Sequence, residues 1–204
     1  MRRNKGAWLQ WKTGGVVMVL LSLGCAGAES LADPSAREAP SGPSVHRILG
    51  VPFVPGEPGA CGPAALASVL AFDGDPVTVE EILRTVGAPS LAGVLPMDLE
   101  RFAAGRRAGV QTTAGSLAWL RERVASDHPV VAFLDLGVGP VRQGHFVVVV
   151  GYDDEAERVV LYSGKDPDAA MSYRRFTAAW RRAAFWALTL GGPAGDDGNR
   201  LSAS

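Results

Sequence analysis

The feature that most restricts the fold of this 204-residue chain is an unbroken apolar run, Phe146–Val150. Its four consecutive valines favour an extended backbone, and a strand without alternating polar residues is buried on both faces. Residues 129–134 form a second run of this kind. After a predicted turn at Asp153-Asp154, Arg158–Tyr162 is expected to pair back as a hairpin arm. The second half of the chain is therefore predicted to contain a buried sheet.

Helical patterns come before these strands. Apolar residues recur at helical spacing in four segments, one of which opens with the capping-box pattern Thr78-Val79-Glu80-Glu81. Ser172 is expected to cap a fifth helix, and Phe185–Leu190 to close the sheet. Helices followed by a mostly antiparallel sheet indicate an α+β fold, with one domain over residues 49–192. The four helical segments are residues 61–71, 78–86, 96–108 and 116–126.

The first 25 residues have the properties of an export signal. They contain four basic residues and no acidic residue, and they end in an apolar run that finishes at Cys25. The run is too short to cross a bilayer, and the combination is typical of a secretory signal peptide. Leu21–Cys25 also resembles a bacterial lipobox, in which the cysteine is lipidated and becomes the mature N-terminus. Ser22 and Leu23 depart from the commonest form of that motif.

We therefore expect an exported protein that is anchored to the membrane through a lipid on Cys25 and faces the periplasm. Plain cleavage after Ala26 or Ala28 and an uncleaved anchor are the alternatives. Residues 26–48 are rich in Ala, Ser, Pro and Gly and predict a flexible tether, and residues 193–204 predict a disordered tail.

Composition excludes several classes of function. The formal net charge of −1 argues against a nucleic-acid partner. Two cysteines are too few for a disulfide scaffold or a four-cysteine zinc site. No phosphate-binding loop occurs, so we expect no ATP binding, no cofactor and no metal.

Cys61 is the only thiol of the predicted domain and lies at a predicted helix N-terminus, after a loop rich in Gly and Pro. Free backbone N–H groups and the helix dipole favour negative charge there, which suits a thiolate nucleophile. An inert small hydrophobic residue is the alternative.

A nucleophilic thiol needs a base, and histidine is the usual one. His46 lies in the predicted tether and His128 precedes a strand, so both are expected to be exposed. His145 opens the most apolar strand of the chain, where a titratable side chain needs a partner. It is therefore the candidate base, unless it is a core histidine with its own hydrogen bonds.

Three segments resemble one family. Val51–Pro55 together with Cys61–Leu70 resembles the nucleophile segment of the bacteriocin-processing, C39-like cysteine peptidases of papain fold. Gly144–Asp153 resembles their histidine strand, and Phe176–Trp180 resembles the following helix of the stand-alone secreted members. The resemblance covers residues 49–192. It implies a papain-like fold and a peptide or protein substrate, with Cys61 as nucleophile, His145 as base and acid, and the Cys61 N–H in the oxyanion hole.

The sequence departs from the family pattern at two positions. Members of the family place a Gln, a second oxyanion donor, a few residues before the cysteine, but Gly56–Ala60 contains none. An Asp or Asn normally orients the histidine, but Ser163 occupies that position and Asp166 follows three residues later. Asp166 is predicted to orient His145 if the loop bends back, and otherwise to be a turn carboxylate before Pro167.

The sequence thus predicts a membrane-tethered cysteine peptidase that uses Cys61, His145 and Asp166. A catalytically inactive or feeble relative that binds peptides or partner proteins is the main alternative. Acyl transfer by the same cysteine and histidine is a third possibility.

Overall fold

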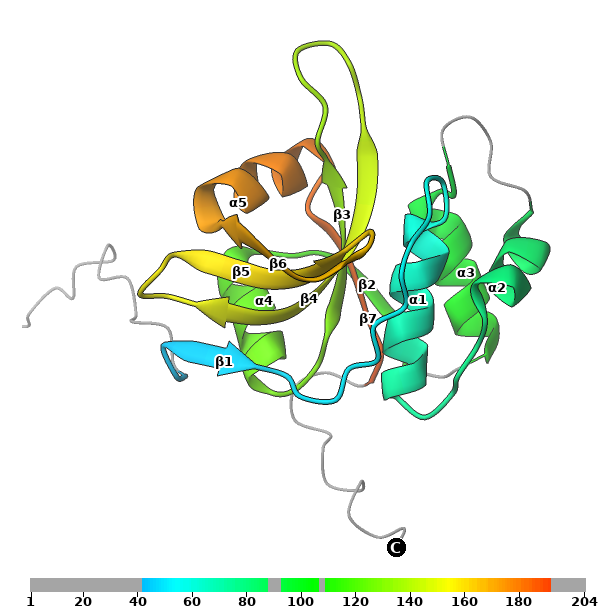
Figure 1. Cartoon of the computed structure of the whole chain (residues 1–204), viewed down its shortest axis with the longest axis horizontal. Coiled ribbons are helices and arrows are strands. Elements are labelled where there is room, and N and C mark those ends of the chain that lie inside the picture. The colour runs from blue at the N-terminus through cyan, green and yellow to red at the C-terminus, as the bar shows by residue number, and fades with distance from the viewer. Residues whose placement is uncertain (1–41, 88–92, 107–108, 192–204) are drawn as a thin grey trace, which may run out of the picture. The chain divides into compact units, whose positions relative to one another are not determined.

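An antiparallel sheet forms the centre of the fold. The computed structural model of the chain describes residues 42–87, 93–106 and 109–191, and within them seven strands belong to one sheet (Figure 1). The strand order is β2-β7-β3-β4-β5-β6, and β1 pairs with β4. The strands are β1 (Val45–Arg47), β2 (Gln111–Ala114), β3 (Val130–Asp135), β4 (Gly144–Asp153), β5 (Arg158–Ser163), β6 (Asp166–Ser172) and β7 (Trp186–Thr189).

Five helices accompany the sheet in the described part of the chain. Helix α1 contacts α2, α3 and strand β4, whereas α4 and α5 pack on the sheet. Figure 1 shows α1, α2 and α3 grouped beside the sheet. None of the described helices is long and apolar enough to span a membrane. The helices are α1 (Cys61–Phe72), α2 (Val79–Val86), α3 (Pro96–Arg106), α4 (Leu117–Ala125) and α5 (Tyr173–Arg182).

Side-chain caps begin three of these helices where the sequence predicts them. The hydroxyls of Thr78, Ser116 and Ser172 each accept a hydrogen bond from the backbone N–H three residues later. Such a bond satisfies one of the N–H groups that a helix start leaves free. The Glu81 carboxylate, the other member of the predicted capping box, pairs with Arg106 at 2.7 Å.

The apolar run in β4 is buried as predicted. Val147–Val150 are at most 1% exposed, because helices or loops cover both faces of the strand. Each fully buried valine stabilises the fold by about 1.5–3 kcal/mol relative to an exposed one. Trp180 of α5 is also fully buried, and its indole N–H donates to the Trp186 carbonyl at 2.8 Å.

The structure corrects the sequence analysis in the N-terminal part of the domain and at two histidines. The tether was expected to reach residue 48, but Val45–Arg47 form β1 and pair with β4. His46 bonds to Asp127 at 2.9 Å rather than standing free in a linker. His128, expected to be exposed, is 7% exposed. The predicted signal, most of the tether and the tail lie outside the described residues.

Candidate active site

Cys61 is the first residue of α1, and its thiol is free and partly exposed. No side chain caps this helix, and its first turn contains no acidic residue. The backbone N–H groups at this helix end therefore remain for an anion, and the positive end of the helix dipole is not neutralised locally.

His145 is the second residue of β4 and is partly buried. Its Nε2 lies 2.9 Å from the hydroxyl oxygen of Ser163, the last residue of the neighbouring strand β5. Burial lowers the pKa of His145 below its ordinary value of 6.5, so the imidazole is neutral at pH 7. Because Ser163 engages Nε2, Nδ1 is the ring nitrogen left to exchange a proton with a nucleophile.

Asp166 does not bend back to His145 as the sequence analysis expected. It is the first residue of β6, it is exposed, and its Oδ1 accepts the backbone N–H of Asp168 at 2.9 Å. The turn between β5 and β6 is short, with Gly164 at φ 60° and Ser163 paired with Asp166. Because of this tight turn, Asp166 is part of β6, and Ser163 is the residue that lies beside the imidazole.

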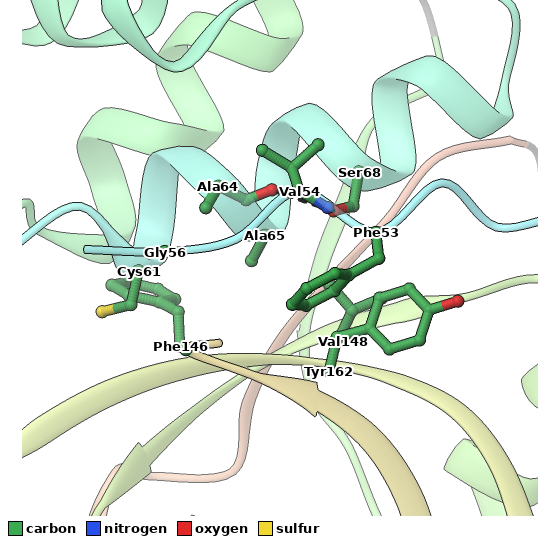
Figure 2. Close-up of a pocket in the computed structure, with 11 residues that line it drawn as sticks. Phe53, Val54, Gly56, Cys61, Ala64, Ala65, Ser68, Phe146, Val148 and Tyr162 are labelled. Atoms are coloured by element: carbon green, nitrogen blue, oxygen red, sulfur yellow. Dashed lines mark hydrogen bonds between the residues drawn. The ribbon is translucent and has the colours of Figure 1, made fainter. Parts of the chain in front are cut away.

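Cys61 lies against Phe146, the residue that follows His145. Cys61 and Phe146 line two hollows together, and Figure 2 shows the two side chains side by side. A Cβ atom added to Gly62 would come within 3.0 Å of the Phe146 ring and of Leu99. Only glycine therefore allows the N-terminus of α1 to approach β4 this closely, which brings Cys61 next to the start of the histidine strand.

The two hollows differ in size. The first is an apolar crevice of about 220 Å³ between α1 and strands β4 and β5, with Val148 and Tyr162 on the sheet side (Figure 2). The second, which we term the open cleft, has a volume of about 710 Å³ out to solvent. Its lining residues are Gly59, Cys61, Gly62, Gly93, Val94, Phe133, Arg142, Gln143, Gly144 and Phe146.

Phe133 is a cleft residue that the sequence does not single out. Its ring packs on that of Phe146, with centroids 4.5 Å apart, and both rings form part of the cleft lining. In the sequence, Phe133 is one member of an apolar strand, and nothing in that pattern separates a cleft residue from a core residue.

The loop before the nucleophile is tied to the turn after Ser163. Gly56 donates its backbone N–H to the Gly164 carbonyl at 2.9 Å, and Glu57 pairs with Lys165 at 2.8 Å. A Cβ atom added to Gly56 would lie 3.1 Å from Cys61 Cα and 3.6 Å from the Cys61 backbone nitrogen. A side chain at this position would therefore reach toward the place where an oxyanion donor is required, but glycine provides none.

The profile of the Peptidase_C39 like family matches residues 48–188, a stretch that includes Cys61, His145 and Ser163. The chain belongs to this family. No curated protein matches the chain significantly.

Three solved structures have a similar fold. A C39-like protein from Bacillus anthracis superposes with a TM-score of 0.63 at 20% identity, covering 72% of this chain and 98% of that one. The peptidase domain of Streptococcus ComA, a bifunctional ABC transporter of a quorum-sensing pathway, gives 0.53 at 21% identity, covering 71% and 100%. A double-glycine-motif protease from an AMS/PCAT transporter, solved with its leader peptide, gives 0.53 at 20% identity, covering 71% and 94%. The predicted α+β, papain-like architecture of the C39-like peptidases is therefore confirmed.

Proposed function

We propose that this C39-like chain is a cysteine peptidase in which Cys61 is the nucleophile and His145 the general base and acid. One observation carries the proposal: Ser163 holds Nε2 of His145, and the remaining ring nitrogen belongs to a neutral imidazole at the start of β4. Cys61 meets the same strand at Phe146 and opens into the cleft. A neutral imidazole next to a thiol can act as its base.

The reaction begins when Nδ1 of His145 takes the thiol proton and the sulfur of Cys61 forms a bond to the peptide carbonyl carbon. The negative charge that develops on the carbonyl oxygen is stabilised by the Cys61 N–H at the start of α1. His145 then returns the proton to the leaving amine as the C–N bond breaks. Water, deprotonated by His145, attacks the thioester, releases the carboxylic acid and regenerates the thiol.

Two features of the site reduce the rate expected of this machinery. The Gly56 position supplies no side-chain donor to the oxyanion, and one such donor is worth about 10²–10³ in rate. Ser163 is a neutral partner, so it orients the imidazole but stabilises the imidazolium less than a carboxylate would. We therefore expect a slow peptidase.

Apolar side chains near the cleft support a peptide substrate. Val138 and Val141 are exposed in the loop that joins β3 to β4, and Leu95 and Met97 are exposed directly after Val94. An extended peptide in the cleft would pass between the loop that carries Val138 and Val141 and the segment that carries Leu95 and Met97. The leader peptide bound to the AMS/PCAT protease gives a precedent for such an occupant.

We further propose that the protein is exported and attached to the cell-envelope membrane through a lipid on Cys25. The support comes from the basic start, the short apolar run and the lipobox-like segment of residues 1–25.

A second candidate function is peptide binding without cleavage. Two features favour it: Gly56 has no side chain to donate to the oxyanion, and Ser163 is not charged. A second oxyanion donor and a charged partner of His145 would stabilise the transition state rather than the bound substrate, so their absence affects cleavage more than binding.

Gly56→Gln, compared with Gly56→Leu, separates the two functions, because φ at Gly56 is not in the left-handed region and the new side chain would be directed toward Cys61. Any new Cβ lies 3.1 Å from Cys61 Cα and must displace that backbone by a few tenths of an ångström, a cost that both variants share. If the site is a peptidase that lacks one donor, peptide turnover by the full chain rises by up to about 10²–10³. Gly56→Leu has a similar size and no donor, and it should give no gain. Cys61→Ala must abolish turnover in every background, and turnover that survives this change would refute the peptidase proposal.

A further inference from the structure

We propose that Asp135 is a positioning residue for the open cleft, because it holds the β3–β4 loop, residues 136–143, in the conformation that forms one cleft wall. The inference rests on the proposed peptidase function, since it concerns how that cleft receives a peptide.

Asp135 lies at the base of the loop and close to the catalytic strand. It is the last residue of β3 and pairs with Gly144, the first residue of β4, while Leu134 pairs with His145. Its side chain is only 8% exposed. A buried carboxylate is costly unless hydrogen bonds compensate for the water it loses, so its partners show what the residue stabilises.

In the described part of the chain, the partners of this carboxylate belong to the loop or to α5. Oδ1 accepts the backbone N–H groups of Gly137 and Gln143, both at 3.0 Å. Oδ2 accepts from Arg142 at 2.5 Å and lies 4.0 Å from Nε of Arg182 on α5. One side chain therefore joins the two ends of the loop, and α5 supports it from behind.

The loop has few other means of holding its shape. Val138 and Val141 are 83% and 66% exposed, so their side chains do not anchor it in the core. Leu136 packs partly buried against the core, and its N–H donates to the Gln143 carbonyl at 2.8 Å, which closes the neck of the loop. A second backbone bond, from the Val141 N–H to the Val138 carbonyl at 3.2 Å, spans its tip. Without the carboxylate of Asp135, we expect the loop to sample several conformations.

The same loop forms part of the site. Arg142, Gln143 and Gly144 line the open cleft opposite Cys61 and Gly62, and Phe133 adds its ring from β3. A loop that moves by about 1 Å changes the fit of a bound peptide, and such misplacements can cost up to about 10²-fold in rate. Loss of Asp135 should therefore weaken peptide binding more than it alters the intrinsic reactivity of the thiol.

Asp153 at the other end of β4 provides a matched control. Its carboxylate also accepts a backbone N–H, from Ala156 at 2.9 Å, and an arginine, Arg158, at 3.0 Å. It is largely buried, but neither it nor its partners line the cleft. Asp135→Asn and Asp153→Asn each keep one oxygen for the backbone N–H groups but lose the charge that pairs with arginine, and only the first change lies beside the cleft.

The test compares these variants in the full chain by three measurements: KM for a peptide substrate, alkylation of Cys61 by iodoacetamide, and alkylation by a peptidyl epoxide. For Asp135→Asn we expect KM to rise about 10-fold and labelling by the peptidyl reagent to slow about as much, with iodoacetamide labelling within about twofold of wild type. Asp153→Asn should leave all three unchanged. If Asp135→Asn does not fold, Arg182→Ala, which removes the support from α5 and does not line the cleft, should give a smaller shift in the same direction.

Three results would overturn the inference: equal effects of the two Asp→Asn variants, no effect of either, or a wild-type chain that shows no preference for the peptidyl reagent. Failure of the proposed function is a separate result. In that case the wild type shows no turnover that depends on Cys61, yet labelling by the peptidyl reagent still falls in Asp135→Asn alone.

Discussion

Replacing Ser163 tests how the imidazole of His145 is oriented. The hydroxyl lies 2.9 Å from Nε2, in a partly buried position. A neutral hydrogen bond of this kind contributes about 0.5–1.5 kcal/mol net. If that contribution supports the transition state in full, Ser163→Ala lowers kcat/KM about 2- to 13-fold. The effect is smaller than the loss expected from removing a charged partner, because the hydroxyl only fixes the ring.

Ser163→Asp makes the complementary change. Burial lowers the pKa of His145, so the wild-type base stays deprotonated to a pH below 6.5. A carboxylate beside Nε2 would favour the imidazolium and raise the pKa of His145. The pH at which the base becomes protonated, and with it the acid limb of the activity profile, should therefore move to higher pH.

The assay is kcat/KM against pH for a peptide substrate, together with the rate of iodoacetamide labelling of Cys61. Ser116→Ala is the control, since it removes a hydroxyl with one bond at 3.1 Å, the cap of α4. It should lower stability by about 1 kcal/mol and leave both rates unchanged. Equal activity of Ser163→Ala and wild type, or an acid limb that does not move in Ser163→Asp, would refute the assignment of Ser163 as the orienting group.

Three further changes have defined outcomes. Gly62→Ala should lower the free energy of unfolding by about 1–3 kcal/mol in a urea titration, because the new methyl group would lie 3.0 Å from Leu99 and Phe146. Unchanged stability would contradict the close approach of α1 to β4. Hydrogen bonds from Arg142 and two backbone N–H groups lower the pKa of Asp135 from 3.8 to about 2, so its contribution to stability is complete above pH 3.8 and lost as the pH falls toward 2. Acid unfolding followed by circular dichroism should therefore be less steep in Asp135→Asn, and an identical curve would count against the network. Cys25→Ser should abolish the mass increase from lipidation in membrane extracts, and an unchanged mass would exclude the lipid anchor.

The elements that could be predicted from sequence are those whose signal is local. The capped helices α2, α4 and α5 begin at residues whose hydroxyls bind their own backbone three positions later. The valines of β4 specify a buried strand regardless of which segments cover it. Cys61 could be singled out for the same reason, since its position at a helix start follows from neighbouring residues.

The elements that could not be predicted depend on partners distant in the chain. Strands β1, β2 and β6 are short or polar, and β6 begins with Asp166-Pro167-Asp168, which has little strand propensity. Each forms because a neighbouring strand is already in place, as β6 does on β5. The role of Asp135 is equally hidden, because its partners come together only when the β3–β4 loop closes and α5 packs.

The partner of His145 could not be identified from the neighbouring residues in the sequence. Asp166 is the better partner by chemistry, since a carboxylate stabilises an imidazolium more strongly than a hydroxyl does. The backbone places Ser163 there instead. The two-residue turn at Gly164-Lys165 leaves Ser163 at the end of β5, beside β4, and makes Asp166 the first residue of β6. The site therefore combines a buried, neutral histidine with a neutral partner and a thiol at the positive end of a helix. In the proposed mechanism a neutral partner stabilises the imidazolium less than a carboxylate would, so the step that charges His145 is supported less strongly. The proposed peptidase would therefore depend more on substrate binding in the open cleft than a peptidase whose histidine pairs with a carboxylate.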